Sequence, residues 1–128
     1  MHSEAVVQQQ VRLALAQRGA QVWRNNVGAC ADESGRIIRY GLANESAQLN
    51  AVIKSSDLVG AVPVVITQDM VGKTVAVFTA VECKHEGWHI TPGDKRAAAQ
   101  QRFIDIVKQV GGFGGFATSV DDLEGILR

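Results

Sequence analysis

The run from Thr74 to Lys84 is the feature of this sequence that most constrains its fold, because it is the clearest candidate for a strand. Its side chains are mostly apolar until the end, where the sequence reads Glu82-Cys83-Lys84. Successive side chains of a strand point to opposite faces, so Glu82 and Lys84 share one face and Cys83 points to the other. The run therefore predicts a strand whose C-terminal end carries a carboxylate beside an ammonium group.

Helical patterns lie on both sides of this strand. One helix is predicted from Ser3 to Arg18, and a second from Thr91 to Val110 with Thr91 as its N-cap. Shorter elements are predicted at Gln21–Arg24, Arg36–Tyr40, Ala47–Ile53, Asp57–Ile66, Phe116–Thr118 and Val120–Leu127. The order helix, strands, helix, strand, helix predicts one α/β domain over residues 1–128, in which helices cover a mixed sheet.

The charge balance argues against a nucleic-acid-binding protein of the usual basic kind. The 128 residues carry 13 basic and 13 acidic side chains, so such a function has to come from how the charges are arranged. No apolar run approaches the about 20 residues that a membrane span needs, and no secretion signal is visible. Cys30 and Cys83 are therefore expected to be free thiols in a reducing compartment, which by elimination is the cytoplasm.

Three segments partly match known ligand-binding motifs but lack the spacing or the structural context that those motifs need. The segment Val71–Thr74 has the end of a phosphate-binding loop but leads into a strand, and it lacks the first glycine of that motif. Gly112–Ala117 matches the dinucleotide fingerprint as text, but its predicted context runs from helix to strand. Cys83, His85 and His89 do not have the spacing of a usual zinc site.

Asp57, which begins the preceding strand run, is a second carboxylate that could lie near Glu82 and Lys84. If the two strands are antiparallel neighbours, Asp57 lies beside Glu82, and two carboxylates at one point favour a hard cation such as Mg²⁺. A lysine beside that metal can orient or deprotonate an attacking water. The alternative is a cross-strand ion pair on the surface, which contributes little to stability.

Two helical residues extend this constellation. Gln100 shares one face with Ala97, Ile104 and Val107, so an amide points toward the buried side and needs a partner, either in the core or on a catalytic water or phosphate. Glu4 shares the face of Val7 and Val11, and either reaches the metal or interacts with the helix dipole.

The ordered set of segments resembles the virus-type replication-repair nuclease (VRR-NUC) family of the PD-(D/E)xK nuclease superfamily. Ser56 stands where the superfamily name has proline, which changes the turn before Asp57 and not its chemistry. The resemblance spans nearly the whole chain and rests on Glu4, Val22–Gly28, Arg39–Leu42, Ser56–Gly60, Val81–Lys84, Gln100–Phe103, Gly111-Gly112 and Gly115–Ser119.

The resemblance implies a restriction-endonuclease-like fold of order αβββαβα and a DNA endonuclease that depends on Mg²⁺ or Mn²⁺. Stand-alone members of that family of this size look like phage or bacterial proteins that act on branched DNA as homodimers, in the manner of Holliday junction resolvases. Lys84 would position the water, and Gln100 would support the nucleophile or the phosphate. The implied site comprises the catalytic residues Asp57, Glu82, Lys84 and Gln100, and the metal ligands Glu4, Asp57, Glu82 and the backbone carbonyl of Cys83.

Contacts to DNA are expected from cations and amides that flank this site, because phosphates bind Arg and Lys. These residues are Arg24, Asn25, Asn26, Arg39, Lys95, Arg96 and Arg102. Trp88, in the loop after Lys84, either stacks on a base or anchors the loop. Two other functions stay open: a non-catalytic DNA-binding module on the same fold, and a nuclease of single strands or ends.

Overall fold

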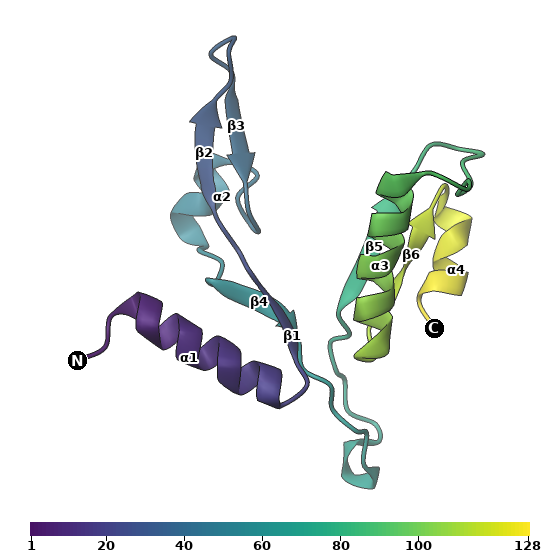
Figure 1. Ribbon diagram of the computed structural model, residues 1–128, viewed down its shortest axis with the longest axis horizontal. Coiled ribbons are helices and arrows are strands. Elements are labelled where there is room, and N and C mark those ends of the chain that lie inside the picture. Colours follow the sequence, from purple (N-terminus) through teal and green to yellow (C-terminus); the bar gives the residue numbers. More distant parts are fainter. The chain divides into compact units, whose positions relative to one another are not determined.

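The computed structural model describes residues 1–128, which form two compact units (Figure 1). One unit comprises Met1–Gln21 and Ala61–Arg128, and the other comprises Val22–Gly60. Four α-helices and three two-stranded sheets make the chain a mixed α/β protein, as the sequence predicts. None of the helices combines the length and the apolar character needed to cross a membrane.

The first helix confirms the sequence prediction almost residue for residue. Helix α1 spans Glu4–Gln17, and the Ser3 hydroxyl accepts a hydrogen bond from the Val6 amide at 3.3 Å. A serine at the N-cap satisfies an amide that has no partner within the helix. No residue of α1 is buried, so the face that Glu4 shares with Val7 and Val11 is not packed into a core.

The C-terminal block is a strand–helix–strand motif. Strand β5 (Thr79–Cys83) leads through a loop into α3 (Lys95–Gln109), which returns the chain to β6 (Phe113–Ala117). The two strands are parallel, and Glu82 lies opposite Phe116 in their register. Parallel strands need a crossover of this kind, and a helix is its usual form. A 3₁₀ turn and the short α4 (Leu123–Ile126) complete the block.

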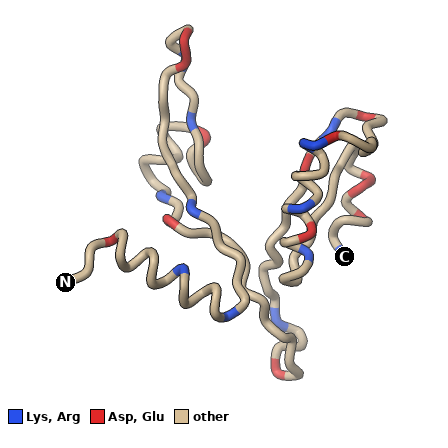
Figure 2. The backbone as a smooth tube through the Cα atoms, in the orientation of Figure 1, with Lys and Arg blue, Asp and Glu red and all other residues tan.

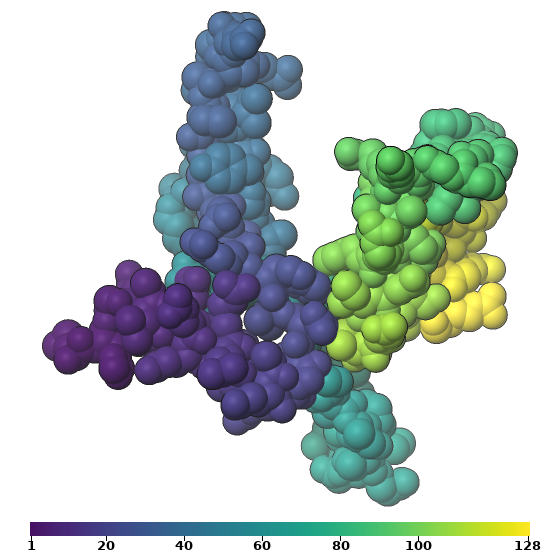
Figure 3. Space-filling model, in the orientation of Figure 1, coloured from purple at the N-terminus to yellow at the C-terminus, as the bar shows by residue number.

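The two helices of this block pack on opposite faces of the β5–β6 pair. A Cβ added to Gly114 would lie 3.0 Å from the Ile104 side chain of α3, whereas one added to Gly115 would lie 2.8 Å from Ile126 of α4. Neighbouring strand residues point to opposite faces, so the two glycines identify which face each helix covers. The space-filling view shows these elements as one continuous mass (Figure 3). Its buried apolar residues are Ala97, Ile104, Val107 and Ile126.

Helix α3 begins later than the sequence prediction, and the Thr91 N-cap is wrong. Its N-cap is Asp94, whose carboxylate accepts a hydrogen bond from the Ala97 amide at 2.9 Å. Gly93 has a φ of +85°, a left-handed conformation that separates Pro92 from the helix. Lys95 and Arg96 consequently lie in the first turn of α3.

The strand pairing assumed for Asp57 and Glu82 is also wrong. Strand β4 covers only Leu58–Ala61 and pairs with β1 (Gln21–Arg24), while β5 pairs with β6. Pro63 has no N–H group to donate to a sheet, which is consistent with the end of β4 at Ala61. A 3₁₀ turn (Gln68–Met70) lies between the two strands. Two-stranded sheets therefore replace the single mixed sheet expected.

The smaller unit is built on a hairpin. Strands β2 (Gly28–Ala31) and β3 (Ile37–Tyr40) are antiparallel, and α2 (Ala47–Val52) follows with Ser46 as its N-cap. The hairpin arm and the short helix predicted here are confirmed. One carboxylate oxygen of Asp32 organises the turn, because it accepts hydrogen bonds from the hydroxyl and the amide of Ser34 and from the amide of Arg36.

These bonds make the hairpin sensitive to acid. The hydrogen bond from the Ser34 side chain and then that from the Arg36 amide lower the pKa of Asp32 below its usual 3.8. A carboxyl with a lowered pKa in the folded state stabilises that state above its unfolded pKa, and the contribution disappears as pH falls through the folded value. We expect Asp32→Asn to melt at a lower temperature than wild type at pH 7. The difference should shrink below pH 3.8, as thermal melts at both pH values can measure.

Asn44 is the buried polar centre of the smaller unit, with a relative exposure of 2%. Its amide group donates to the carbonyls of Gly28 and Tyr40, both at 2.8 Å, and its side-chain oxygen accepts from Arg39 at 2.7 Å. Asn44→Ala removes all three hydrogen bonds and leaves the two carbonyls without this donor. We therefore expect a loss of about 2–3 kcal/mol in unfolding free energy. Urea denaturation measures it, with the exposed Asn26→Ala as the control. Equal stability of the two variants would contradict the prediction.

Candidate active site

The site centres on Glu82 and Lys84 at the C-terminal end of β5. Their side chains share one face of the strand, as predicted, and Lys84 Nζ lies 4.0 Å from Glu82 Oε1. Lys84 is 18% exposed and Glu82 39% exposed, so both reach solvent without projecting fully into it. The carboxyl ends of parallel strands are where α/β proteins usually place their ligand sites. This face is also the one that α3 covers, because Glu82 lies two residues after Ala80, the partner of Gly114.

Helix α3 adds Gln100 to this face. An open pocket of about 670 Å³ is lined by Glu82 and by Arg96, Gln100 and Phe103, among other residues of β5 and α3. The side-chain oxygen of Gln100 is buried and has no hydrogen-bond partner. Most buried acceptors are paired, so an unpaired one beside a pocket that contains Glu82 and Arg96 indicates a functional position. The prediction that Gln100 points to the buried side is confirmed, while Gln101 bonds to Asp105 instead.

The cations of α3 lie on two sides of the helix. Arg96 lines the pocket with Gln100, one helical turn further along. Lys95 and Arg102 lie outside its lining, and all three cations are exposed. Figure 2 shows Lys and Arg at several levels of α3. Because Arg96 is the cation that shares the pocket with Glu82, it is the best placed of the three to contact a phosphate there.

Two aromatic rings surround Lys84. Its Nζ lies 5.2 Å from the centre of the Trp88 ring and 6.0 Å from that of Phe116. The two rings are 4.8 Å apart and tilted by 40°. Sequence reasoning considered Trp88 only as a base-stacking or anchoring residue, and it gave Phe116 no role at the site. The available signal was an aromatic residue four positions after the lysine, with a turn-forming glycine just before it.

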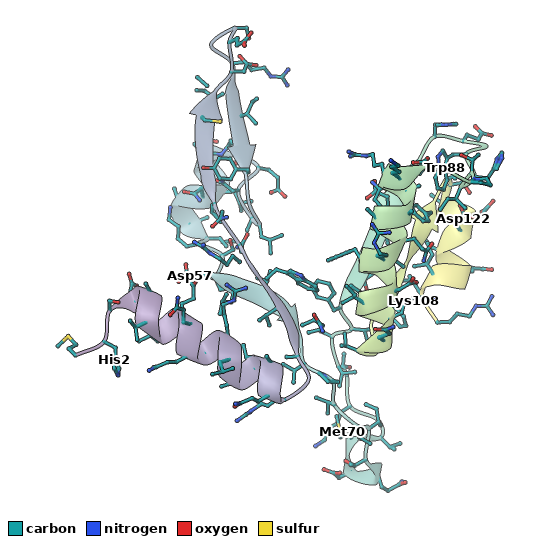
Figure 4. The ribbon with its side chains drawn as sticks, in the orientation of Figure 1. His2, Asp57, Met70, Trp88, Lys108 and Asp122 are labelled. Atoms are coloured by element: carbon teal, nitrogen blue, oxygen red, sulfur yellow. The ribbon has the colours of Figure 1, made fainter.

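Asp57 belongs to the other compact unit, directly before β4, and its side chain is exposed (Figure 4). The Asp57 carbonyl accepts a hydrogen bond from the Asn25 amide at 2.8 Å. The Asn25 side chain donates to Ser55 Oγ and the Ser56 carbonyl, both at 2.8 Å, and accepts from the Leu42 amide. Asn25 therefore holds the turn that presents Asp57.

The other residues predicted to bind DNA in this unit differ in how free they are. Arg39 is half-buried and is engaged by the carbonyl and the side chain of Asn44. Arg24 and Asn26 are exposed. The structure thus uses Asn25 and Arg39 in hydrogen bonds within the unit, and leaves Arg24 and Asn26 on its surface.

The remaining predicted ligands are Glu4 and Cys83. Glu4 is exposed in the first turn of α1. Cys83 is an exposed free thiol on the opposite face of β5 from Glu82, and its predicted contribution comes from the backbone carbonyl at the strand end. Cys30 is also a free thiol, as predicted.

The donor chemistry of the site suits a hard divalent cation. Glu82 offers a partly exposed carboxylate, and Gln100 offers an amide oxygen without a partner. Oxygen donors completed by water are what Mg²⁺ and Mn²⁺ prefer. No group of three or more His, Cys, Asp or Glu side chains is gathered as a metal cluster in the structure. Glu82 and Gln100 are thus the candidate side-chain ligands of the C-terminal block.

Comparison of the chain with protein-family models, with curated proteins and with solved structures finds no match in any of the three.

Proposed function

We propose that this protein is a DNA endonuclease that depends on Mg²⁺ or Mn²⁺ and hydrolyses phosphodiester bonds in branched DNA. The observation that carries the proposal is the Glu82–Lys84 pair, which lies at a parallel strand end and shares its face with the unpaired oxygen of Gln100. A surface ion pair explains the charges alone, but it explains neither the pocket nor the unpaired amide. The resemblance to the VRR-NUC family names the same residues.

The chain's own residues have distinct tasks in this proposal. Glu82 and Gln100 bind the metal or its water. The metal, when bound, supplies a Lewis acid that polarises the phosphate and lowers the pKa of a bound water. Lys84 donates hydrogen bonds from its ammonium group, which orients the attacking water and stabilises charge that develops on the phosphate oxygens. Arg96, which lines the same pocket as Glu82, binds a neighbouring phosphate.

A homodimer is part of the proposal. The chain holds one Glu82–Lys84 pair, and symmetric cutting of a four-way junction needs two sites. The DNA contacts come from the surface cations and amides Arg24, Asn26, Lys95 and Arg102, because their side chains are exposed. A neutral net charge is compatible with this arrangement once a divalent cation is bound among the acidic ligands.

A panel of labelled DNA substrates tests the proposal. Four-way, flap, nicked and linear duplexes are incubated with the full chain and Mg²⁺ or Mn²⁺, with and without EDTA. We expect cutting of the branched substrates that EDTA abolishes. Cutting of single strands or ends alone would replace the junction specificity with an end-directed nuclease. Binding without cutting, together with no Mn²⁺ heat in calorimetry, would replace the enzyme with a non-catalytic DNA-binding module.

A further inference from the structure

The ammonium group of Lys84 lies in an aromatic environment as well as beside a carboxylate. Trp88 and Phe116 come from different elements, the loop after β5 and the strand β6, yet both rings lie within the range of a cation–π contact with Lys84 Nζ. Trp88 is the nearer ring, at 5.2 Å against 6.0 Å. Indole is also the strongest of the aromatic partners for a cation. Of the two aromatic rings, Trp88 therefore makes the stronger contact with Lys84.

Backbone geometry brings these groups together. Phe116 lies opposite Glu82 in the parallel register, so its ring points to the same face as Glu82 and Lys84. The chain then reverses in a turn closed by a hydrogen bond of 3.1 Å from the Trp88 amide to the His85 carbonyl. Gly87 occupies this turn with a φ of +82°, which favours glycine. The turn returns Trp88 to the strand end, where Figure 4 shows it in the loop.

The rings of Trp88 and Phe116 also contact each other, so they form one packed surface against the Lys84 side chain. Their centres are 4.8 Å apart at an angle of 40°, a tilted arrangement within the favourable range for aromatic pairs. Both side chains are half-buried, and Lys84 is only 18% exposed. A long, flexible lysine side chain loses substantial rotamer freedom when it is fixed, and packing against rings offsets that loss.

We propose that Trp88, supported by Phe116, is a positioning residue that holds the Lys84 ammonium group beside Glu82. The carboxylate and the indole both attract the ammonium, which restricts Nζ to the strand end. This role rests on the proposed nuclease function for its consequence in catalysis, but the contact itself does not depend on that function. Trp88 acts through its contact with Lys84.

Nuclear magnetic resonance tests the contact without any activity. The full-length protein is reductively methylated with ¹³C, and Lys84→Arg identifies the Lys84 signal. We expect that signal to be displaced upfield by the ring current in wild type, to lose the displacement in Trp88→Leu, and to keep part of it in Trp88→Phe. His89→Ala, an exposed neighbour in the same loop, is the matched control and should leave the signal in place.

Kinetics test the positioning role. Trp88→Leu should lower kcat on a branched substrate by about fivefold to thirtyfold, the range of a partly desolvated cation–π contact, with KM nearly unchanged. Trp88→Phe should restore most of kcat. An undisplaced Lys84 signal in wild type, or one that Trp88→Leu leaves displaced, would overturn the contact. A lost displacement with an unchanged kcat would overturn the positioning role. A displaced signal in a chain that cuts no DNA supports the contact and counts against the nuclease proposal alone.

Discussion

Glu82→Gln and Lys84→Ala should each reduce metal-dependent cleavage of branched DNA by about 10³-fold. The first change removes a charged metal ligand, and the second removes the ammonium that orients the water and stabilises the developing charge. Each side chain is partly exposed at a strand end, so its loss leaves the packed core intact. Initial rates on a labelled four-way junction measure the effect, and circular dichroism checks the fold.

The controls for these variants lie in the same block. Glu86→Gln changes an exposed acid just beyond the strand end, and Lys108→Ala changes an exposed lysine near the far end of α3 (Figure 4). Both should retain activity. The double variant Glu82→Gln/Lys84→Ala should be little worse than either single change, since residues that act as a unit are not additive. Full activity in both Glu82→Gln and Lys84→Ala would contradict the assignment of the site.

Gly112→Ala should destabilise the C-terminal block by about 3 kcal/mol. A Cβ at this position would lie 2.6 Å from Val107 Cγ1, 2.7 Å from the Phe78 carbonyl oxygen and 2.9 Å from the Val107 carbonyl oxygen. Two of these neighbours are backbone atoms, one directly before β5 and one in the last turns of α3, and they cannot rotate away. Overpacking of this kind costs about 1–3 kcal/mol and sometimes more. Urea denaturation measures the loss, provided that the variant and the wild type have the same m-value.

Gly125→Ala is the opposite-sign control for this prediction. Gly125 lies within α4 and an added Cβ would meet nothing within 4 Å, so alanine should leave stability unchanged or raise it by up to about 1 kcal/mol. If both variants had wild-type midpoints, the close approach at Gly112 would not be a feature of the folded protein. If both were destabilised alike, the loss would come from glycine replacement in general.

Local signals predicted the helices well where one signal stood alone. Ser3 is the single good cap before α1, and the helix begins where that residue predicts. Before α3 the pattern predicted Thr91 as the cap, whereas the structure has Asp94 there, and the left-handed backbone at Gly93 separates the two. A backbone angle of this kind depends on the surrounding loop, so the sequence pattern did not reveal it.

Strand pairing was the part that sequence could not settle. Alternation in the run ending at Lys84 predicted a strand, and it also predicted correctly that Glu82 and Lys84 share a face. It contains no information about which strand lies alongside. The structure pairs β5 with β6 across α3, whereas the prediction chose the preceding segment. Pairing is a nonlocal property, and the shortest connection is only the most frequent choice.

The same distinction applies to the site residues. Gln100 was predictable because helical spacing alone assigns its face. The rings around Lys84 were not, because Phe116 reaches the site through the strand register and Trp88 through the turn at Gly87. Both depend on pairs of segments rather than on one periodic pattern.

The two glycines at the centre of β6 determine how the C-terminal block transmits force. At Gly114 an added Cβ would lie 3.0 Å from the Ile104 side chain and 3.5 Å from the Ile104 carbonyl oxygen, so α3 packs closely against the strand. Protein interiors packed this closely have low compressibility and transmit strain. Strand β5, strand β6 and α3 should therefore move as one rigid body when a ligand binds. The distance between Gln100 and Glu82 should then stay the same with and without the ligand.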